Sequence, residues 1–363
     1  MRTTRAEYRH GSAPRLGLVI TNLGTPDAPE APALRRYLRQ FLSDPRVVEI
    51  PRPIWWLILN LFILPFRPSR SAAKYRSIWS AEGSPLKVHT ARQATMLAGY
   101  LGARGLRGVE VVYAMRYGSP SIPAALDALC EKGCDRVIVV PLYPQYAAST
   151  TASTFDAVAA WSAQQRNLPG IDFVRNFHDH PRYIAALGAA LLAHWEREGG
   201  RPDVLVMSFH GLPRYTLERG DPYHCECHKT ARLLAEFLGL APDAWRVSFQ
   251  SRFGRTPWLT PYTVDSLADL GRERTGRVDV ICPGFVADCL ETLEEIAIEA
   301  RETFVAAGGG KFTYVPCLNE NDAWLHALAE IVTPHITALS RPAVSAAEQD
   351  AARHRALALG ANQ

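Results

Sequence analysis

Short apolar runs rich in valine and isoleucine recur along the chain, and longer amphipathic stretches separate them. The runs predict buried strands at 16–22, 109–115, 136–141, 204–209, 246–249 and 278–282. Near-continuous apolar strands are typical of parallel sheets that helices cover on both faces. The intervening stretches predict helices, the clearest being 31–42, 91–101, 122–131, 183–198 and 230–238. This alternation along the whole length predicts an α/β fold.

The pattern falls into two blocks that break at 176–181. We therefore expect two similar doubly wound, Rossmann-like domains, each built on a parallel sheet. The expected order is an N-terminal tail (1–14), a first domain (15–180), a second domain (181–320), a helical segment (321–340) and a tail (341–363). The last helix, 322–332, is predicted to stop before Pro334 and to pack back on the first domain.

Residues 54–66 read IWWLILNLFILPF, in which Asn60 is the only polar residue. A helix that spans a bilayer needs roughly 18 to 20 apolar residues, so this segment is too short to cross one. It is either a core helix closed by Pro65 or an exposed apolar lip. Paired tryptophans suit a lip that guards an apolar pocket or touches a membrane surface.

Composition narrows the functional class. The net charge of +4 over 363 residues gives no reason to expect a nucleic-acid partner. Seven scattered cysteines do not form the dense, even set of a secreted disulfide framework, which indicates a reducing compartment. The apolar run at 16–20 is too short for the core of a signal peptide. We therefore expect a cytoplasmic protein, with contact at the inner face of the membrane as the alternative that 54–66 leaves open.

Ligands of open α/β sheets bind beyond the carboxyl ends of the strands, and His210 stands at such an end in VLVMSFHGLP. A histidine there can act as a base near neutral pH or as a metal ligand. The alternative is a structural histidine that hydrogen-bonds to the Gly–Leu–Pro turn.

An acidic stripe follows the last predicted strand. If the stretch from 288 is helical, one face carries five carboxylates: Asp288, Glu291, Glu295, Glu299 and Glu302. Clustered carboxylates can bind hard cations or pass protons along a row. The alternative is the solvated face of an ordinary amphipathic helix.

Two further motifs carry weaker signals. Cys225 and Cys227, flanked by His224 and His228, have the residue types of a metal site, but they form one half-site at most and the alternative is ordinary thiols. Gly24 and the run at 308–311 match neither the dinucleotide nor the P-loop pattern, which argues against a nucleotide enzyme.

Several motifs together resemble those of the ferrochelatases, in unbroken order from about residue 15 to 335. They are NLGTP (22–26), Tyr75 and Arg76 ahead of EGSPL, MRYG (115–118), YPQY (143–146), SFHGLP (208–213), GDPY (220–223), FQSRFG (249–254), PWL (257–259) and CPGFVADCLET (282–292). The resemblance implies a chelatase-like pair of α/β domains with a porphyrin cleft between them. It also implies that 54–66 forms the lip over that cleft.

By the resemblance, His210 and Glu291 face each other across the porphyrin as catalytic and metal residues. The implied reaction inserts ferrous iron into protoporphyrin IX and forms protohaem, with iron and porphyrin as substrates and no cofactor firmly expected. His210 would accept a pyrrole proton, and Asp288 and Glu295 would extend a proton or metal path from Glu291. The implied pocket residues are Leu23, Arg76, Arg116, Tyr117, Ser251 and Trp258.

The chain departs from the family pattern at two points. Cys289 stands where many relatives have histidine, so a role for that histidine does not carry over. Some relatives bind an iron–sulfur cluster through a cysteine-bearing C-terminal extension, but the last cysteine here is Cys317. The sequence therefore does not support such a cluster.

Three rival functions stay open at this stage. A chelatase of the same fold could act on coproporphyrin, which has four carboxylates where protoporphyrin has two. It could also insert cobalt in place of iron. The apolar lip favours the less charged porphyrin. A non-catalytic porphyrin carrier would need an axial ligand and a pocket, but no acidic row opposite the histidine.

Overall fold

The fold is built on two parallel sheets. The structure, a computed structural model, describes residues 10–13, 15–254, 256–341 and 344–362. Within these residues two four-stranded sheets form, ordered β2-β1-β3-β4 and β6-β5-β7-β8. The strands are β1 (Arg15–Gly24), β2 (Val109–Tyr117), β3 (Cys134–Pro141), β4 (Gly170–Phe173), β5 (Val204–His210), β6 (Trp245–Gln250), β7 (Arg277–Ile281) and β8 (Lys311–Tyr314). The predicted α/β fold with two parallel sheets is confirmed.

Both sheets reverse their strand order beside their first strand. β1 pairs with β2 on one side and β3 on the other, and β5 lies in the same way between β6 and β7. Open α/β sheets bind ligands at the carboxyl ends of strands beside such a reversal. The fold therefore points to the segments that follow β1, β5 and β7.

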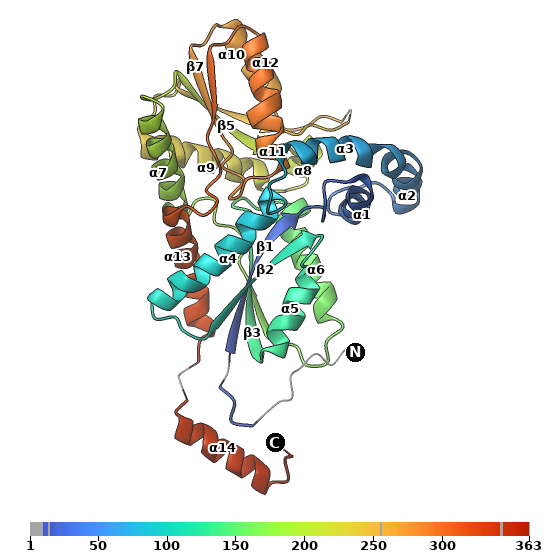
Figure 1. The fold of residues 1–363 in the computed structure, drawn as a ribbon, viewed down its shortest axis with the longest axis vertical. Coiled ribbons are helices and arrows are strands. Elements are labelled where there is room, and N and C mark those ends of the chain that lie inside the picture. The colour runs from blue at the N-terminus through green and yellow to red at the C-terminus, as the bar shows by residue number, and fades with distance from the viewer. Residues whose placement is uncertain (1–9, 14, 255, 342–343, 363) are drawn as a thin grey trace.

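Helices cover the sheets and connect them (Figure 1). In the first half they are α1 (Ala31–Leu42), α2 (Arg52–Ile58), η1 (Leu59–Ile63), α3 (Leu64–Ile78), α4 (Pro85–Ala103), α5 (Ile122–Glu131), η2 (Ala148–Ala152) and α6 (Ser153–Ser162). In the second half they are α7 (Pro181–Arg197), α8 (Arg214–Glu218), α9 (Tyr223–Leu238), α10 (Thr263–Arg272), α11 (Leu290–Leu293), η3 (Glu295–Ala300), α12 (Arg301–Ala306), α13 (Asp322–Leu339) and α14 (Ala346–Ala358). The three η segments are π-helical.

The structure confirms all six predicted strands and all five predicted internal helices. The sequence did not reveal β4 and β8, because each is a four-residue edge strand that is only partly buried. α4 and α9 begin six and seven residues before their predicted starts, α4 with Pro85 in its first turn. Proline is tolerated there because the first N–H groups of a helix have no partner within the helix.

The segment 54–66 forms parts of α2, η1 and α3 and presents apolar side chains to solvent. Trp56, Phe62 and Phe66 are 61%, 65% and 69% exposed, while Trp55 and Leu59 are buried. The buried-helix alternative is therefore wrong, because only one side of the segment packs inward. Pro65 does not close a helix either, since it lies in the first turn of α3.

One hydrophobic core runs through both sheets. It joins Leu18 of β1 and Met207 of β5 to buried side chains of α4, α7, α9 and α13. In Figure 1, α13 runs beside both halves of the molecule, from α7 to the first sheet. The exact domain boundaries stay a prediction, since the core does not divide at residue 180.

α13 continues past Pro334 to Leu339, so the predicted stop before that proline is wrong. Proline cannot donate a hydrogen bond to the carbonyl four residues earlier, here that of Glu330. Val332 and Ile336 are buried on either side of Pro334, so packing against α4 and α7 outweighs this loss. The segment 341–363, expected as a tail, contains the exposed helix α14.

Among the described residues, no helix combines the length and the apolar character needed to cross a bilayer.

Trp324 tests how far the shared core determines stability. It is fully buried and contacts the rings of Phe177 and Tyr183. We expect Trp324→Ala to lower the free energy of unfolding by about 3–5 kcal/mol, because it leaves a large cavity. Urea unfolding monitored by circular dichroism measures this loss. Leu357→Ala on the exposed face of α14 is the control and should change stability by less than about 0.5 kcal/mol. Equal effects of the two substitutions would show that α13 does not anchor the core.

Candidate active site

His210 is the last residue of β5, and its ring orientation is fixed by the next residue. Nδ1 lies 2.7 Å from the carbonyl oxygen of Gly211. A carbonyl only accepts hydrogen bonds, so Nδ1 carries the proton in this contact. In the neutral ring, Nε2 therefore has its lone pair available for a proton or a metal ion.

Gly211 is required at the turn after His210 because two groups approach it closely. A Cβ there would lie 2.7 Å from the carbonyl oxygen of Gln250 and 3.2 Å from the indole of Trp258. The Gly211 N–H also donates to that carbonyl at 2.7 Å. The turn thus holds Trp258, a predicted pocket residue, next to His210.

Glu291 lies in the first turn of α11, which follows β7. It lines a narrow cavity together with Leu23, Tyr37, Tyr75 and Cys289. The cavity leaves about 10 Å³ for the centre of a water molecule, close to the minimum for a single water. Burial and the negative charge of Glu291 raise the pKa of the Tyr75 phenol well above its usual range. Tyr75 therefore stays protonated beside this carboxylate.

Gln250, which the sequence analysis did not single out, connects these two residues. It pairs with His210 in the register of β5 and β6 and is 3% exposed. Its Nε2 donates to the backbone carbonyl of Glu291 at 2.7 Å, and its Oε1 accepts from the Ser208 hydroxyl at 2.7 Å. Gln250 is therefore a positioning residue. The available signals were its place directly after the predicted strand 246–249 and its position in the FQSRFG motif.

Glu295 is the second carboxylate beside the histidine. It accepts hydrogen bonds from the Ser251 N–H at 2.6 Å and from the Ser251 hydroxyl at 2.5 Å. Ser251 makes both contacts from a left-handed backbone conformation with φ of 65°, which is uncommon for a residue other than glycine. Burial raises the pKa of Glu295, and the nearby charges of His210 and Glu291 act on it in opposite directions. The structure thus brings Ser251, Glu295, His210 and Glu291 together.

The acidic stripe predicted from 288 to 302 does not form as a single regular helix. Asp288 precedes α11, and its carboxylate accepts hydrogen bonds from four groups: the Tyr314 hydroxyl, the Asn319 amide, the Cys317 N–H and the Thr292 hydroxyl. It therefore fastens the end of β8 and its following loop to α11. It is not part of a row with Glu295.

The π-helical segment η3 changes which carboxylates share a face. Glu294 and Glu299, five residues apart, both bind the ammonium group of Lys74 on α3, at 2.9 Å and 2.7 Å. A spacing of five matches the i to i+5 repeat of a π-helix. These two ion pairs tie η3 to α3, the helix in which the lip ends.

Cys289 caps the N-terminus of α11 and is 4% exposed. Burial raises the pKa of its thiol well above the usual range, and the charge of Glu291 adds to this effect. The thiol therefore stays protonated near neutral pH. A protonated thiol does not accept a proton, so Cys289 is not a base at this position.

The polar groups of the remaining predicted pocket residues are bound to partners other than His210 and Glu291. Arg116 and Tyr117 both bind the buried carboxylate of Asp44, with Arg116 Nη2 at 2.5 Å and the Tyr117 hydroxyl at 2.8 Å. Tyr117 is fully buried. Arg76 is exposed on α3 and donates to the carbonyl of Pro29 at 3.3 Å. The sequence motifs alone could not separate these residues from those beside His210.

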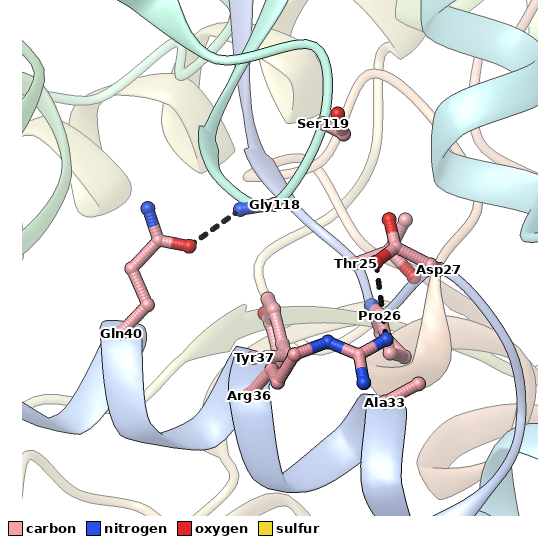
Figure 2. Close-up of a pocket in the computed structure, with 9 residues that line it drawn as sticks. All are labelled: Thr25, Pro26, Asp27, Ala33, Arg36, Tyr37, Gln40, Gly118 and Ser119. Atoms are coloured by element: carbon pink, nitrogen blue, oxygen red, sulfur yellow. Dashed lines mark hydrogen bonds and ion pairs between the residues drawn. The ribbon is translucent and has the colours of Figure 1, made fainter.

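A wider hollow of about 240 Å³ lies at the carboxyl ends of β1 and β2. Figure 2 shows that α1 contributes Arg36, Tyr37 and Gln40, and that the turns after β1 and β2 supply the other side. Two of its polar contacts are internal: Arg36 lies 3.6 Å from Asp27, and Gln40 accepts from the Gly118 N–H. Tyr37 lines both this hollow and the narrow cavity of Glu291. None of the predicted site residues lines it.

No group of three or more histidine, cysteine or carboxylate side chains is gathered to hold a metal ion in the parts of the chain that the structure describes.

Comparison with known proteins places the chain in a family. The family model described as Ferrochelatase matches residues 15–336. The curated ferrochelatase of Janthinobacterium sp. (strain Marseille) is 61% identical, over 92% of this chain and 90% of that protein. The ferrochelatase of Azoarcus sp. (strain BH72) is also 61% identical, over 99% of this chain and 98% of its own length.

Solved structures support the fold alone. SirB from Bacillus subtilis with Fe3+ superposes with a TM-score of 0.52 at 12% identity, over 88% of this chain and 94% of that one. The sirohydrochlorin chelatase SirB from Bacillus subtilis subspecies spizizenii, in complex with cobalt, gives a TM-score of 0.51 at 10% identity, over 90% and 97% of the two chains. Both superpositions span the two sheets. From the family model and the near full-length relatives, the chain belongs to the ferrochelatase family.

Proposed function

We propose that this protein inserts ferrous iron into protoporphyrin IX to form protohaem. Its relatives are named ferrochelatases, and its site has the parts that the reaction needs. The observation that carries the proposal is the arrangement of His210 with Glu291 and Glu295 at the carboxyl ends of β5 and β7. A base and two carboxylates lie together there, held by Gln250 and Ser251.

The chemistry requires that two pyrrole N–H protons leave as Fe²⁺ forms four bonds to nitrogen. His210 accepts a proton at Nε2, because Nδ1 already donates to the Gly211 carbonyl. Glu291 holds the metal ion or takes a proton from the facing side. Glu295, whose pKa is raised by burial, passes protons onward. Its raised pKa brings it closer to neutral pH, where proton transfer in both directions is efficient.

We infer that the fixed backbone around His210 and Glu291 holds the macrocycle bent. Bending a porphyrin exposes the nitrogen lone pairs and brings it closer to the transition state. Short hydrogen bonds fix both ends: Gly211 to Gln250 on the histidine side, and Gln250 to Glu291 on the other. We place Leu23, Ser251 and Trp258 in the porphyrin pocket because they adjoin these groups. The assignment of Arg76, Arg116 and Tyr117 rests on the resemblance, and Asp288 acts as a scaffold residue.

The exposed apolar lip, residues 54–66, supports a weakly charged porphyrin as substrate and contact with a membrane surface. Its outward side chains, among them Trp56, Phe62 and Phe66, offer apolar cover suited to protoporphyrin, which has only two carboxylates. Arg67 on α3 lies over the ring of Phe253, 4.8 Å from its centroid, so the lip helix reaches the loop that follows Ser251. The same apolar surface supports peripheral contact with the inner face of the membrane.

Removal of either central group tests the proposal. We expect His210→Ala and Glu291→Gln each to lower the rate of anaerobic iron insertion by about a hundredfold or more, because each removes a proton or metal acceptor. Insertion is followed by the change in porphyrin absorbance. Glu302→Gln, at an exposed position on α12, is the matched control and should keep the wild-type rate.

The same assay separates the rival functions. Activity on coproporphyrin with none on protoporphyrin would show that coproporphyrin is the substrate. Faster insertion of cobalt than of iron would show that cobalt is the metal. Tight porphyrin binding without insertion of any metal would identify a carrier and overturn the proposed function.

Burial of Glu295 predicts a dependence of stability on pH. Its pKa is raised in the folded protein above the usual 4.5, so the folded state favours the protonated form. The stability that Glu295 contributes is then fully present below the unfolded-state pKa and is lost as pH rises through the folded-state value. Glu295→Gln removes this titration but keeps an oxygen that accepts from Ser251.

We therefore expect the stability of wild type relative to Glu295→Gln to fall as pH rises from about 4 towards neutrality. Urea unfolding of both proteins across this range measures the difference. Glu302→Gln again serves as the control. If the stability of wild type relative to Glu295→Gln rises with pH instead, the folded protein stabilises the ionised form of Glu295.

A further inference from the structure

Two histidines on α9 lie together outside the proposed active site. His224 and His228 are four residues apart, so they occupy neighbouring positions on one face of the helix. Their ring centroids are 4.5 Å apart. This spacing is the one by which a helix presents two imidazoles to a single metal ion.

The fold separates this pair from the cysteines between them. Cys227 is fully buried in the core. The neighbouring Glu226 is also turned away from the histidines, because its buried carboxylate accepts hydrogen bonds from the Tyr146 N–H at 2.7 Å and from the Asn176 amide at 2.8 Å. Cys225 is exposed. The two thiols thus face different surroundings, and the half-site considered from the sequence reduces to the two imidazoles.

The rings are held in place before any ion binds. The His224 ring stacks on Phe249, with centroids 5.6 Å apart and planes inclined by 19°. The His228 ring lies 6.1 Å from the same phenylalanine. Such packing restricts rotation of the rings and lowers the entropy cost of ordering them around an ion.

The pair is also open and electrostatically suited to a cation. His228 is exposed and His224 is partly exposed, so an ion can reach both from solvent. Burial against the protein lowers the pKa of each imidazole, which favours the neutral form that binds metals. The adjacent Lys229 is already paired with Asp179 at 2.6 Å.

We propose that His224 and His228 chelate one divalent transition-metal ion of the borderline class, such as Zn²⁺, Co²⁺ or Cu²⁺. Imidazole nitrogen suits these ions better than it suits Mg²⁺ or Ca²⁺. The described residues gather no third ligand, so water fills the remaining positions and the ion exchanges readily. The two rings pack on Phe249, whereas the side chain of the next residue, Gln250, donates to the backbone of Glu291. Successive side chains of a strand point to opposite faces of a sheet, so the histidine pair and Glu291 lie on opposite sides of β6.

Isothermal titration of the full-length protein with Zn²⁺ tests this proposal. The titration is run in a His210→Ala, Glu291→Gln background, so that the ligands proposed for iron do not contribute. In that background we expect one bound ion, lost or weakened about tenfold or more in His224→Ala and in His228→Ala, because each leaves a single ligand in place of a chelate. His354→Ala, an exposed histidine on α14, is the matched control and should bind as the background does.

A second readout identifies the ligands directly. Cu²⁺ bound to the background protein should give an electron paramagnetic resonance spectrum with coupling to two imidazole nitrogens, which the single variants lose. Circular dichroism confirms that each variant is folded. Zinc binding that is unchanged in both His224→Ala and His228→Ala would overturn the proposal, as would loss of the site in His354→Ala alone.

Discussion

The arrangement of the site depends on the hydrogen bonds of one buried amide. Gln250 stands beside His210 in the sheet, donates to the backbone of Glu291 and accepts from Ser208. An unsatisfied buried polar group costs about 1–3 kcal/mol, so these partners are strongly held to their positions. The end of β5, the end of β6 and the start of α11 therefore keep one geometry. The proposed base and the facing carboxylate both follow from it.

The carboxylates take their different roles from their surroundings. Asp288 is saturated with hydrogen bonds and joins the loop after β8 to α11. Glu294 and Glu299 meet Lys74 and fasten η3 to the lip helix. Glu291 and Glu295 remain on the side of His210, where burial raises the pKa of Glu295. One acidic stretch of sequence thus supplies a scaffold, an inter-element tie and the proposed proton acceptors.

The sequence predicted what depends on continuous burial and missed what depends on packing or irregular backbone. The strands ending at Gly24 and His210 were evident because their apolar runs are long. The short edge strands β4 and β8 carry too few buried residues to stand out. Pro334 signalled a helix end, but the core on both sides of α13 overrides that preference.

The site was predicted in part for similar reasons. His210 ends β5 and Glu291 stands in the segment that follows β7, and a sheet fold places ligands at such strand ends. No residue pattern announces the π-helical segment η3, which removes Glu299 from the expected row, and Asp288 lies before the start of α11. Nor could motif order show that Tyr117 is buried against Asp44 while Ser251 reaches Glu295. Those facts depend on contacts between residues far apart in the sequence.

The proposed function requires that a porphyrin bind between His210 and Glu291. A crystal structure of the protein with metal-free protoporphyrin IX tests it most directly. We expect the macrocycle to lie with Nε2 of His210 over one face and the carboxylate of Glu291 over the other, under the lip formed by 54–66. A macrocycle seated elsewhere, for example in the hollow of Figure 2 with both residues away from its nitrogens, would contradict the account.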